Sequence, residues 1–398
     1  MKDELCRRRQ LLTATIFIFV FMGGFSLSTC MLGTLLPGMI VHYSLSLTQS
    51  SAINNFYEIG SIFSLALGLF VVDRLDKGKL LTALGLLLGL VLIFHSTAPA
   101  FLLLLVIRVI MGMVGGLLDN LCNCYISDLY GEQRARYIPI LGTIYSLGSM
   151  AAPKFAALCY TAGSWALAYL VSGVAMAAAG VLAILIFKIM GYPPKAADLP
   201  QEAARGSIPF RRIFCSRNMI WLCAASFLLS GQTYVTIWLS TYLDWLDRSV
   251  YTVELCSTIM TASYVGSIVS RVIMAAISDR VRSEDYLKWG SLASSLLFMG
   301  LILLDQPMAW MAGGFVYQVL SGALFSSRIT LACEESPQYS AAATSLLSIF
   351  VALGNMAFNF FMGMVADAGY YTQAMLAATG IIALTFLVFQ FGYRSKKD

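Results

Sequence analysis

The sequence is short of charge. Asp, Glu, Lys and Arg make up only 12% of its 398 residues, and 59% of the residues are hydrophobic. Soluble domains carry about 25% charged residues, so this composition excludes a soluble globular protein of this length. The formal net charge of +5 arises from an uneven distribution of charge among the polar segments. It therefore does not indicate a nucleic-acid-binding patch, and no nucleic-acid partner is expected.

Chemical motifs are also scarce. The nine cysteines lie mostly within apolar stretches and show no zinc, redox or disulfide spacing, so we interpret them as small packing residues. No phosphate-binding loop is present, which excludes ATP as the direct energy source. No nucleophile–base pair or metal cluster occurs at matching depth. We therefore predict that the protein is not an enzyme and has no cofactor and no metal.

Long apolar runs are what the sequence has instead. Runs of about 20 residues are long enough to cross the hydrocarbon core of a bilayer as helices. The sequence predicts an all-α, multi-pass membrane protein with twelve such helices, at residues 11–40, 50–72, 79–97, 101–127, 137–160, 165–189, 218–242, 253–277, 286–304, 308–333, 341–366 and 372–393.

The distribution of positive charge predicts the orientation of these helices. Successive polar segments between the helices lie on alternate sides of the membrane. Most of the 26 lysines and arginines fall in the segments of one side, whereas Arg248 alone lies in a segment of the other side. Positively charged loops stay in the cytoplasm. We expect a protein of the cytoplasmic (inner) membrane with both termini in the cytoplasm.

A polar break divides the chain into two halves that resemble each other. Residues 190–217 are rich in proline and charge and predict a cytoplasmic linker between bundles of six helices at 1–189 and 218–398. An offset of 206 residues aligns Gly60 with Gly266, Gly116 with Gly322, Asp128 with Glu334, and Leu-Gly-Ser-Met at 147–150 with Leu-Gly-Asn-Met at 353–356. Such repeated halves are one of the known transporter architectures.

The stretch from Arg108 to Arg136 carries the most informative polar pattern. Arg108 and Asp119 are separated by about three helical turns and so lie on one face of a helix, together with or close to Gly112, Gly115, Gly116 and Asn123. Asn120 adjoins this face. Ionised groups within a membrane span are costly and typically mark a transport path.

Other polar residues fall at mid-depth in the expected helices. Asn54 and Glu58 lie one turn apart on the second helix, and Gln232, Tyr234 and Trp238 form an amide and aromatic face on the seventh. Such a face suits sugar-like ligands through stacking and hydroxyl hydrogen bonds. Arg328 lies near the inner end of the tenth helix.

The charged turns resemble a known family. Gly68-Leu-Phe-Val-Val-Asp73-Arg74-Leu-Asp76-Lys77-Gly78-Lys79 resembles the loop between the second and third helices of the major facilitator superfamily, although it has one extra residue before Asp73 and Asp76 in place of a glycine. Arg108, Gly112 and Gly115 resemble the fourth-helix motif of that superfamily. The resemblance implies two six-helix bundles around a central cavity lined by the first, fourth, seventh and tenth helices, with substrate moved by rocking of the halves.

A finer resemblance points to one group within this superfamily. Leu-Asp119-Asn-Leu-Cys-Asn123, Gly131-Glu-Gln, Gly148 and Leu35-Leu36-Pro37 are similar to the fucose permease group of sugar–proton symporters. The second acidic residue of that group falls on Gly33 here, so either Glu58 has taken over part of its role or the coupling differs. This resemblance implies proton-coupled symport of a small polar solute, with sugar as the leading class.

Each of these residues has a structural interpretation beside the functional one. Asp119 either binds a proton or holds helices together, and Glu58 and Arg108 form either a structural ion pair or one released by protonation. Arg328 holds an anionic substrate, neutralises an acid or extends its charge to the cytoplasmic surface. Trp238 belongs either to the ligand face or to an aromatic belt at the membrane surface.

The turns Asp73–Arg74 and Asp279–Arg280 are either gates that pair with helix ends in one conformation or plain solvated turns. We predict a secondary transporter that functions as a monomer in the bilayer with a small-molecule substrate and a coupling ion, the proton. The alternatives are a proton-driven exporter of hydrophobic or cationic compounds and, from a different class, a membrane receptor.

Overall fold

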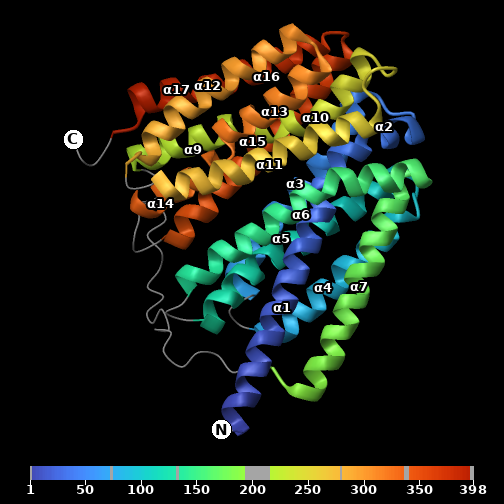
Figure 1. The fold of residues 1–398 in the computed structure, drawn as a ribbon, viewed down its shortest axis with the longest axis vertical. Helices are drawn as coiled ribbons and strands as arrows, with labels where there is room; N and C mark the ends of the chain where they lie inside the picture. Colours follow the sequence, from blue (N-terminus) through green and yellow to red (C-terminus); the bar gives the residue numbers. More distant parts are fainter. Residues whose placement is uncertain are drawn as a thin grey trace. The chain divides into compact units, whose positions relative to one another are not determined.

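The structure is a computed structural model that describes residues 2–71, 75–130, 134–192, 216–277, 280–335 and 340–394, and within these ranges all regular elements are helical. The first half of the sequence forms α1 (Lys2–Cys30), α2 (Leu32–Tyr43), α3 (Leu47–Val71), α4 (Lys77–Ser96), α5 (Phe101–Tyr130), α6 (Arg134–Ala162) and α7 (Trp165–Met190) (Figure 1). The second half forms α9 (Arg217–Leu229), α10 (Gly231–Leu246), α11 (Val253–Ile277), α12 (Ser283–Leu304), α13 (Pro307–Ser321), α14 (Leu324–Glu335), α15 (Ser340–Asp367), α16 (Tyr371–Ala383), α17 (Thr385–Leu387) and the π-helical turn η3 (Val388–Gly392).

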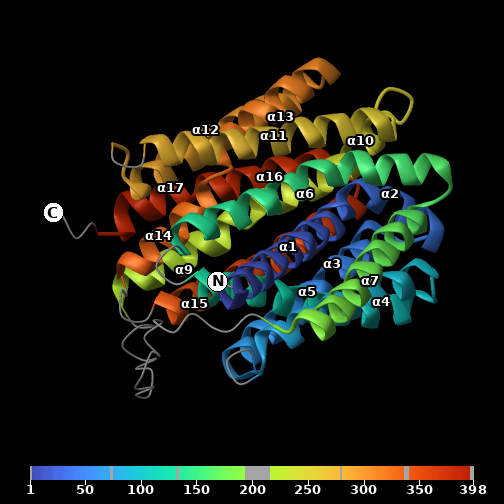
Figure 2. The same cartoon turned by 60° about the horizontal axis from the view of Figure 1, so that its bottom comes forward.

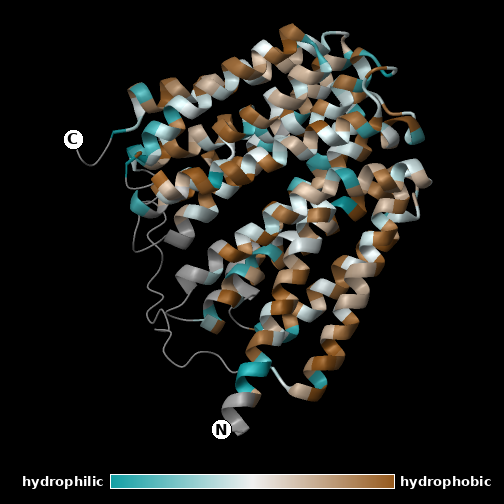
Figure 3. Ribbon diagram, in the orientation of Figure 1, coloured by the Kyte–Doolittle hydropathy of each residue, from teal (hydrophilic) through white to brown (hydrophobic). Residues whose placement is uncertain are grey.

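These helices make twelve rods in the part of the chain described, as predicted, when helices that continue one another are joined. Among the described residues, ten stretches are long and apolar enough to cross a membrane, and α2 is a shorter apolar helix. Brown, apolar residues run along the helices, and hydrophilic residues gather at several helix ends and turns (Figure 3). The prediction of an all-α membrane protein is confirmed.

Three of the expected rods are broken. The first is interrupted at Met31, the seventh at Ser230 and the tenth at Gly322 and Ala323. At Ser230 the side-chain hydroxyl donates to the carbonyl of Phe227, so it competes with the helical hydrogen bonds of the backbone. At Ala323 the backbone N–H donates to Ser270 Oγ of another helix at 3.1 Å. Side chains thus make hydrogen bonds with the backbone at two of these breaks, the seventh and the tenth.

The chain forms two compact units, of which the first comprises Met1–Leu35 and Phe56–Ala204 and the second Leu36–Asn55 and Arg205–Asp398. The second unit therefore includes most of α2 and the start of α3, although both belong to the first half of the sequence. The expected linker at 190–217 lies for the most part outside the described residues.

In the first unit, glycines bring helix backbones together. α4 packs along α7, as Figures 1 and 2 show. A Cβ at Gly89 would lie 2.7 Å from the Cα of Ala177, and one at Gly173 would lie 3.0 Å from the carbonyl oxygen of Gly89. Small residues permit this close approach, which stabilises helix pairs in lipid by van der Waals contact.

The two units contain the same helix crossing. In the first unit, Gly60 of α3 abuts the carbonyl of Val109 in α5, and in the second, Gly266 of α11 abuts the carbonyl of Phe315 in α13. Gly116 likewise abuts Ser64 and lies near Ser61 Oγ, while Gly322 lies against Ser267. Each pair is related by the offset of 206 residues found in the sequence. The aligned glycines therefore occupy equivalent positions in two copies of one packing motif.

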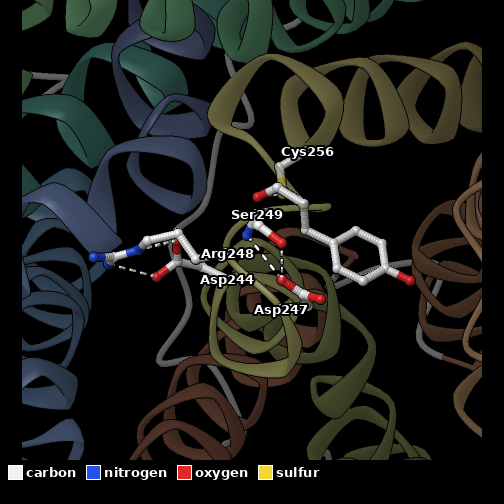
Figure 4. Close-up of polar contacts among 6 residues, drawn as sticks. Asp244, Asp247, Arg248, Ser249 and Cys256 are labelled. Carbon is white, nitrogen blue, oxygen red and sulfur yellow. Dashed lines mark hydrogen bonds and ion pairs between the residues drawn. The ribbon is translucent and has the colours of Figure 1, made fainter.

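The connection between α10 and α11 is held by local polar contacts (Figure 4). Arg248 donates from Nε and Nη2 to the two carboxylate oxygens of Asp244 at 2.9 and 2.8 Å. Asp247 accepts from both the N–H and the hydroxyl of Ser249. The Tyr251 hydroxyl donates to Asp305 at 2.9 Å, which ties this connection to the end of α12.

Candidate transport site

The polar face of α5 packs against α3. The guanidinium of Arg108 is 2% exposed and lies 5.3 Å from the centre of the Tyr57 ring, and its Nη1 lies 4.0 Å from Met111 Sδ. The carbonyl of Tyr57 abuts Gly112, and its hydroxyl lies 3.5 Å from where a Cβ of Gly115 would be. Arg108, Gly112 and Gly115 thus share one face, as the spacing predicts, and Tyr57 covers that face.

Asp119 lies further along the same helix. Its side chain is half-buried, and Asn123, one turn on, donates from Nδ2 to its backbone carbonyl at 2.9 Å and to its Oδ1 at 3.3 Å. Asn120 turns to another partner, because its Oδ1 accepts from Cys124 Sγ at 3.4 Å. A carboxylate with an amide donor beside it and partial access to solvent is suited to binding and releasing a proton.

Tyr57 of α3 lies among polar and charged residues of this unit. Its ring is 5.3 Å from the Arg108 guanidinium, Glu58 follows it in the sequence, and its hydroxyl is 3.5 Å from Thr29 Oγ1. Glu58 itself is half-buried in α3. Sequence reasoning did not select Tyr57, although its place beside Glu58 and one turn after Asn54 was available as a signal.

The second unit holds the remaining predicted residues. Gln232, just after the break in the seventh rod, donates to the carbonyl of Ser321 at 3.2 Å. Arg328, just after the break in the tenth rod, donates from Nη1 to the carbonyl of Ser226 at 3.1 Å. The side chain of Tyr234 lies outside the described residues.

Trp238 and Asn54 lie in a packed region of the second unit. Trp238 is fully buried and donates from Nε1 to Asn359 Oδ1 at 2.8 Å. A residue of an aromatic belt would instead lie at the surface of the protein. Asn359 donates in turn to the carbonyl of Ser51 and to Asn55 Oδ1 at 2.8 Å. Asn54 is buried and adjoins this network in sequence.

A second contact joins the same helices. Asp367, the last residue of α15, accepts from the backbone N–H groups of Leu47 at 2.6 Å and Thr48 at 2.7 Å, which are otherwise unpaired donors at the N-terminus of α3. Gly363 lies between these contacts, where a Cβ would be 2.6 Å from the Leu47 carbonyl oxygen. We call the hydrogen bonds of Asn359 and Asp367 with residues 47–55 the α3–α15 latch.

The expected gates are only partly described. Asp73, Arg74 and Asp279 lie outside the described residues, and Arg280 is exposed with its backbone N–H bonded to Ile277. The structure adds an ion pair that sequence reasoning missed, between Lys77 Nζ and Asp128 Oδ2 at 2.7 Å. Asp128 had a signal, because the repeat aligns it with another acidic residue, Glu334.

His95, in the last turn of α4, is fully buried, and neither imidazole nitrogen has a hydrogen-bond partner among the described residues. Its ring lies 4.2 Å from the Tyr169 ring centre and 5.8 Å from that of Trp165. Both of these rings belong to α7, so the burial of His95 cannot be predicted from its position on its own helix.

Comparison with known families decides what kind of protein this is. The sequence matches the Major Facilitator Superfamily over residues 14–358. The chain belongs to this superfamily. It is a transporter and not an enzyme, and the family prediction made from the charged turns is confirmed. No curated protein sequence matches it closely enough to be reported.

Solved structures share the fold of this transporter. A crystal structure of the nucleoside transporter NupG, as a D323A mutant, matches with a TM-score of 0.80 and 16% identity, covering 97% of this chain and 100% of that one. A D-xylose–proton symporter matches with a TM-score of 0.74 and 14% identity, over 96% and 97% of the two chains. An inward-facing bacterial homologue of the human lysosomal transporter Spinster matches at 0.73 and 16%, over 98% and 99%.

Proposed function

We propose that this transporter couples the movement of a small polar solute, sugar-like in its hydroxyl groups, to the movement of protons by alternating access. The halves 1–189 and 218–398, joined by the linker 190–217, would rock as units. We place the protein in the cytoplasmic membrane with both termini in the cytoplasm, acting as a monomer.

Asp119 carries this proposal. It is a half-buried carboxylate in a membrane span, its partner Asn123 is neutral, and it shares a helix face with Arg108 and the glycines that pack against α3. A neutral amide partner leaves the carboxylate able to exist in both protonation states. Proton binding on one side of the membrane and release on the other would then accompany each crossing of solute.

Gradient-driven uptake into proteoliposomes tests the proposal. The purified protein should accumulate one member of a panel of sugars and organic acids when the interior is alkaline, and sodium should not replace the pH gradient. Asp119→Asn should lose accumulation by at least about tenfold while keeping exchange of internal for external solute, because the bound solute still crosses when proton exchange is blocked.

Asp247→Asn is the matched control. It makes the same chemical change in the exposed connection between α10 and α11, so accumulation should be unchanged. Full accumulation by Asp119→Asn would refute the proton site. Expulsion of solute against its gradient, instead of uptake, would refute symport and favour the exporter.

A further inference from the structure

Two broken helices of the second unit brace each other. α9 and α13 each end within a stretch long and apolar enough to span the membrane, so carbonyls of their last turns need hydrogen-bond donors from elsewhere. Gln232 of α10 donates to Ser321 at the end of α13, and Arg328 of α14 donates to Ser226 in the last turn of α9. Each helix that resumes after a break therefore bonds to the helix that ends at the other break.

The two braces differ in charge. Arg328 is 5% exposed, its Nε has no hydrogen-bond partner, and its contacts in the described part of the chain are the neutral Ser226 carbonyl and the Phe325 ring, 5.2 Å away. Three other cations of the described residues, by contrast, meet carboxylates: Lys77 with Asp128, Arg248 with Asp244, and Arg282 with Glu284. A buried cation without a carboxylate is costly.

Neither structural interpretation explains this charge. Extension to the surface does not, because the side chain is buried and its guanidinium bonds to the backbone of α9. Bracing does not, because Gln232 makes the equivalent contact with a neutral amide. A neutral residue at position 328 would hold the helix end without the cost of burying a charge.

We propose that Arg328 binds the carboxylate of the transported solute, and that the substrate class is hydroxylated organic acids such as sugar acids. The inference rests on the proposed function and names its substrate. A carboxylate supplies the missing negative charge and two oxygens that match the planar fork of a guanidinium.

Neighbouring polar groups suit the rest of such a molecule. Ser226 Oγ is fully buried with no hydrogen-bond partner among the described residues, and Ser226 is the residue whose carbonyl Arg328 contacts. Gln318, also buried, has one side-chain hydrogen bond among the described residues, a long one from its Nε2 to Thr236 Oγ1 at 3.4 Å. Hydroxyl groups of the solute both donate and accept hydrogen bonds, so they can bond to the side-chain amide of Gln318 and to the hydroxyl of Ser226.

Thermal unfolding of the purified full-length protein in detergent tests this without any gradient. Gluconate, glucuronate and lactate are compared with glucose, glucuronamide and lactamide at equal ionic strength set with chloride. At least one acid should raise the unfolding temperature in a saturable way while its neutral analogue does not, because ligands stabilise the state that binds them.

Variants assign the effect to Arg328. Arg328→Gln keeps an amide donor for the Ser226 carbonyl and should fold, but its affinity for the acid should fall by at least about tenfold. Arg328→Lys should retain part of the affinity, because it keeps the charge and loses the fork. Arg271→Gln removes a half-buried cation of α11 in the same unit and should bind the acid as the parent does.

The result that overturns the inference is an equal shift with acid and neutral analogue, a shift that survives in Arg328→Gln, or no shift with any acid. These outcomes are separate from the proton proposal, since Asp119→Asn should still show the acid-dependent shift. Proton-driven uptake of a neutral sugar, with no effect of any acid, would leave the proposed function standing and reject the anion site.

Discussion

Loss of the Asn359 side chain should weaken the α3–α15 latch. It is 1% exposed and makes three hydrogen bonds, to Trp238 Nε1, the Ser51 carbonyl and Asn55 Oδ1. Asn359→Ala removes all three and leaves buried partners unpaired. Two of these hydrogen bonds, those to Ser51 and Asn55, belong to the latch, so at about 1 kcal/mol for each the latch loses about 2 kcal/mol. Its opening equilibrium should therefore increase by about thirtyfold.

Hydrogen–deuterium exchange of the purified protein measures this opening directly. Backbone amides of residues 47–55 should exchange up to about thirtyfold faster in Asn359→Ala, because exchange requires the local opening that the latch opposes. Amides of α4 and α7, which belong to the first unit, should exchange as in the parent.

Asn218→Ala is the matched control for Asn359→Ala. Asn218 is also an asparagine with side-chain hydrogen bonds, to Glu335 Oε1 at 2.9 Å and to the carbonyl of Arg394 at 2.8 Å, and it lies at the start of α9. Exchange at 47–55 should not change in that variant. Unchanged exchange at 47–55 in Asn359→Ala, or equal acceleration in both variants, would show that the network does not hold α3 to α15.

Three further predictions concern stability in detergent. Gly112→Ala places a methyl group against the Tyr57 carbonyl and should lower the stability by about 1–3 kcal/mol, whereas an unchanged unfolding temperature would contradict the close crossing. Asp128→Asn should cost about 1–3 kcal/mol through the loss of its ion pair with the Lys77 ammonium, and a double variant with Lys77→Met should recover part of this loss if the pair is real. Burial raises the pKa of Tyr251 above its usual 10.0, so the neutral phenol stabilises the fold fully below pH 10 and less as the pH rises above it. Between pH 8 and 11 the unfolding temperature should therefore fall more steeply for the parent than for Tyr251→Phe. An equal fall in both proteins would reject the effect.

The rods and their duplication could be predicted from the sequence because both depend on local or regularly repeated information. Apolar length alone decides whether a segment can span a bilayer, since the backbone must satisfy its own hydrogen bonds there. The offset that aligned Gly60 with Gly266 also aligned the residues they abut, Val109 and Phe315. A repeat in sequence preserved the helix crossing because only glycine permits a carbonyl so close.

The candidate site was predicted in part. The common face of Arg108, Gly112 and Gly115 follows from helical periodicity alone, and the structure shows all three against Tyr57. The Asp119–Asn123 contact follows from the same periodicity, because residues four apart meet on a helix.

What the sequence determined by itself was therefore the number of membrane helices, their repeat and the faces of single helices, all of which are set by residues near one another in the chain or by a fixed period. Only the tertiary structure decided where the rods break and which groups Gln232, Arg328 and Asn359 bind. A buried polar atom forms hydrogen bonds with groups on the helices packed against it. Those groups lie tens to hundreds of residues away in the sequence, and no periodic spacing predicts them.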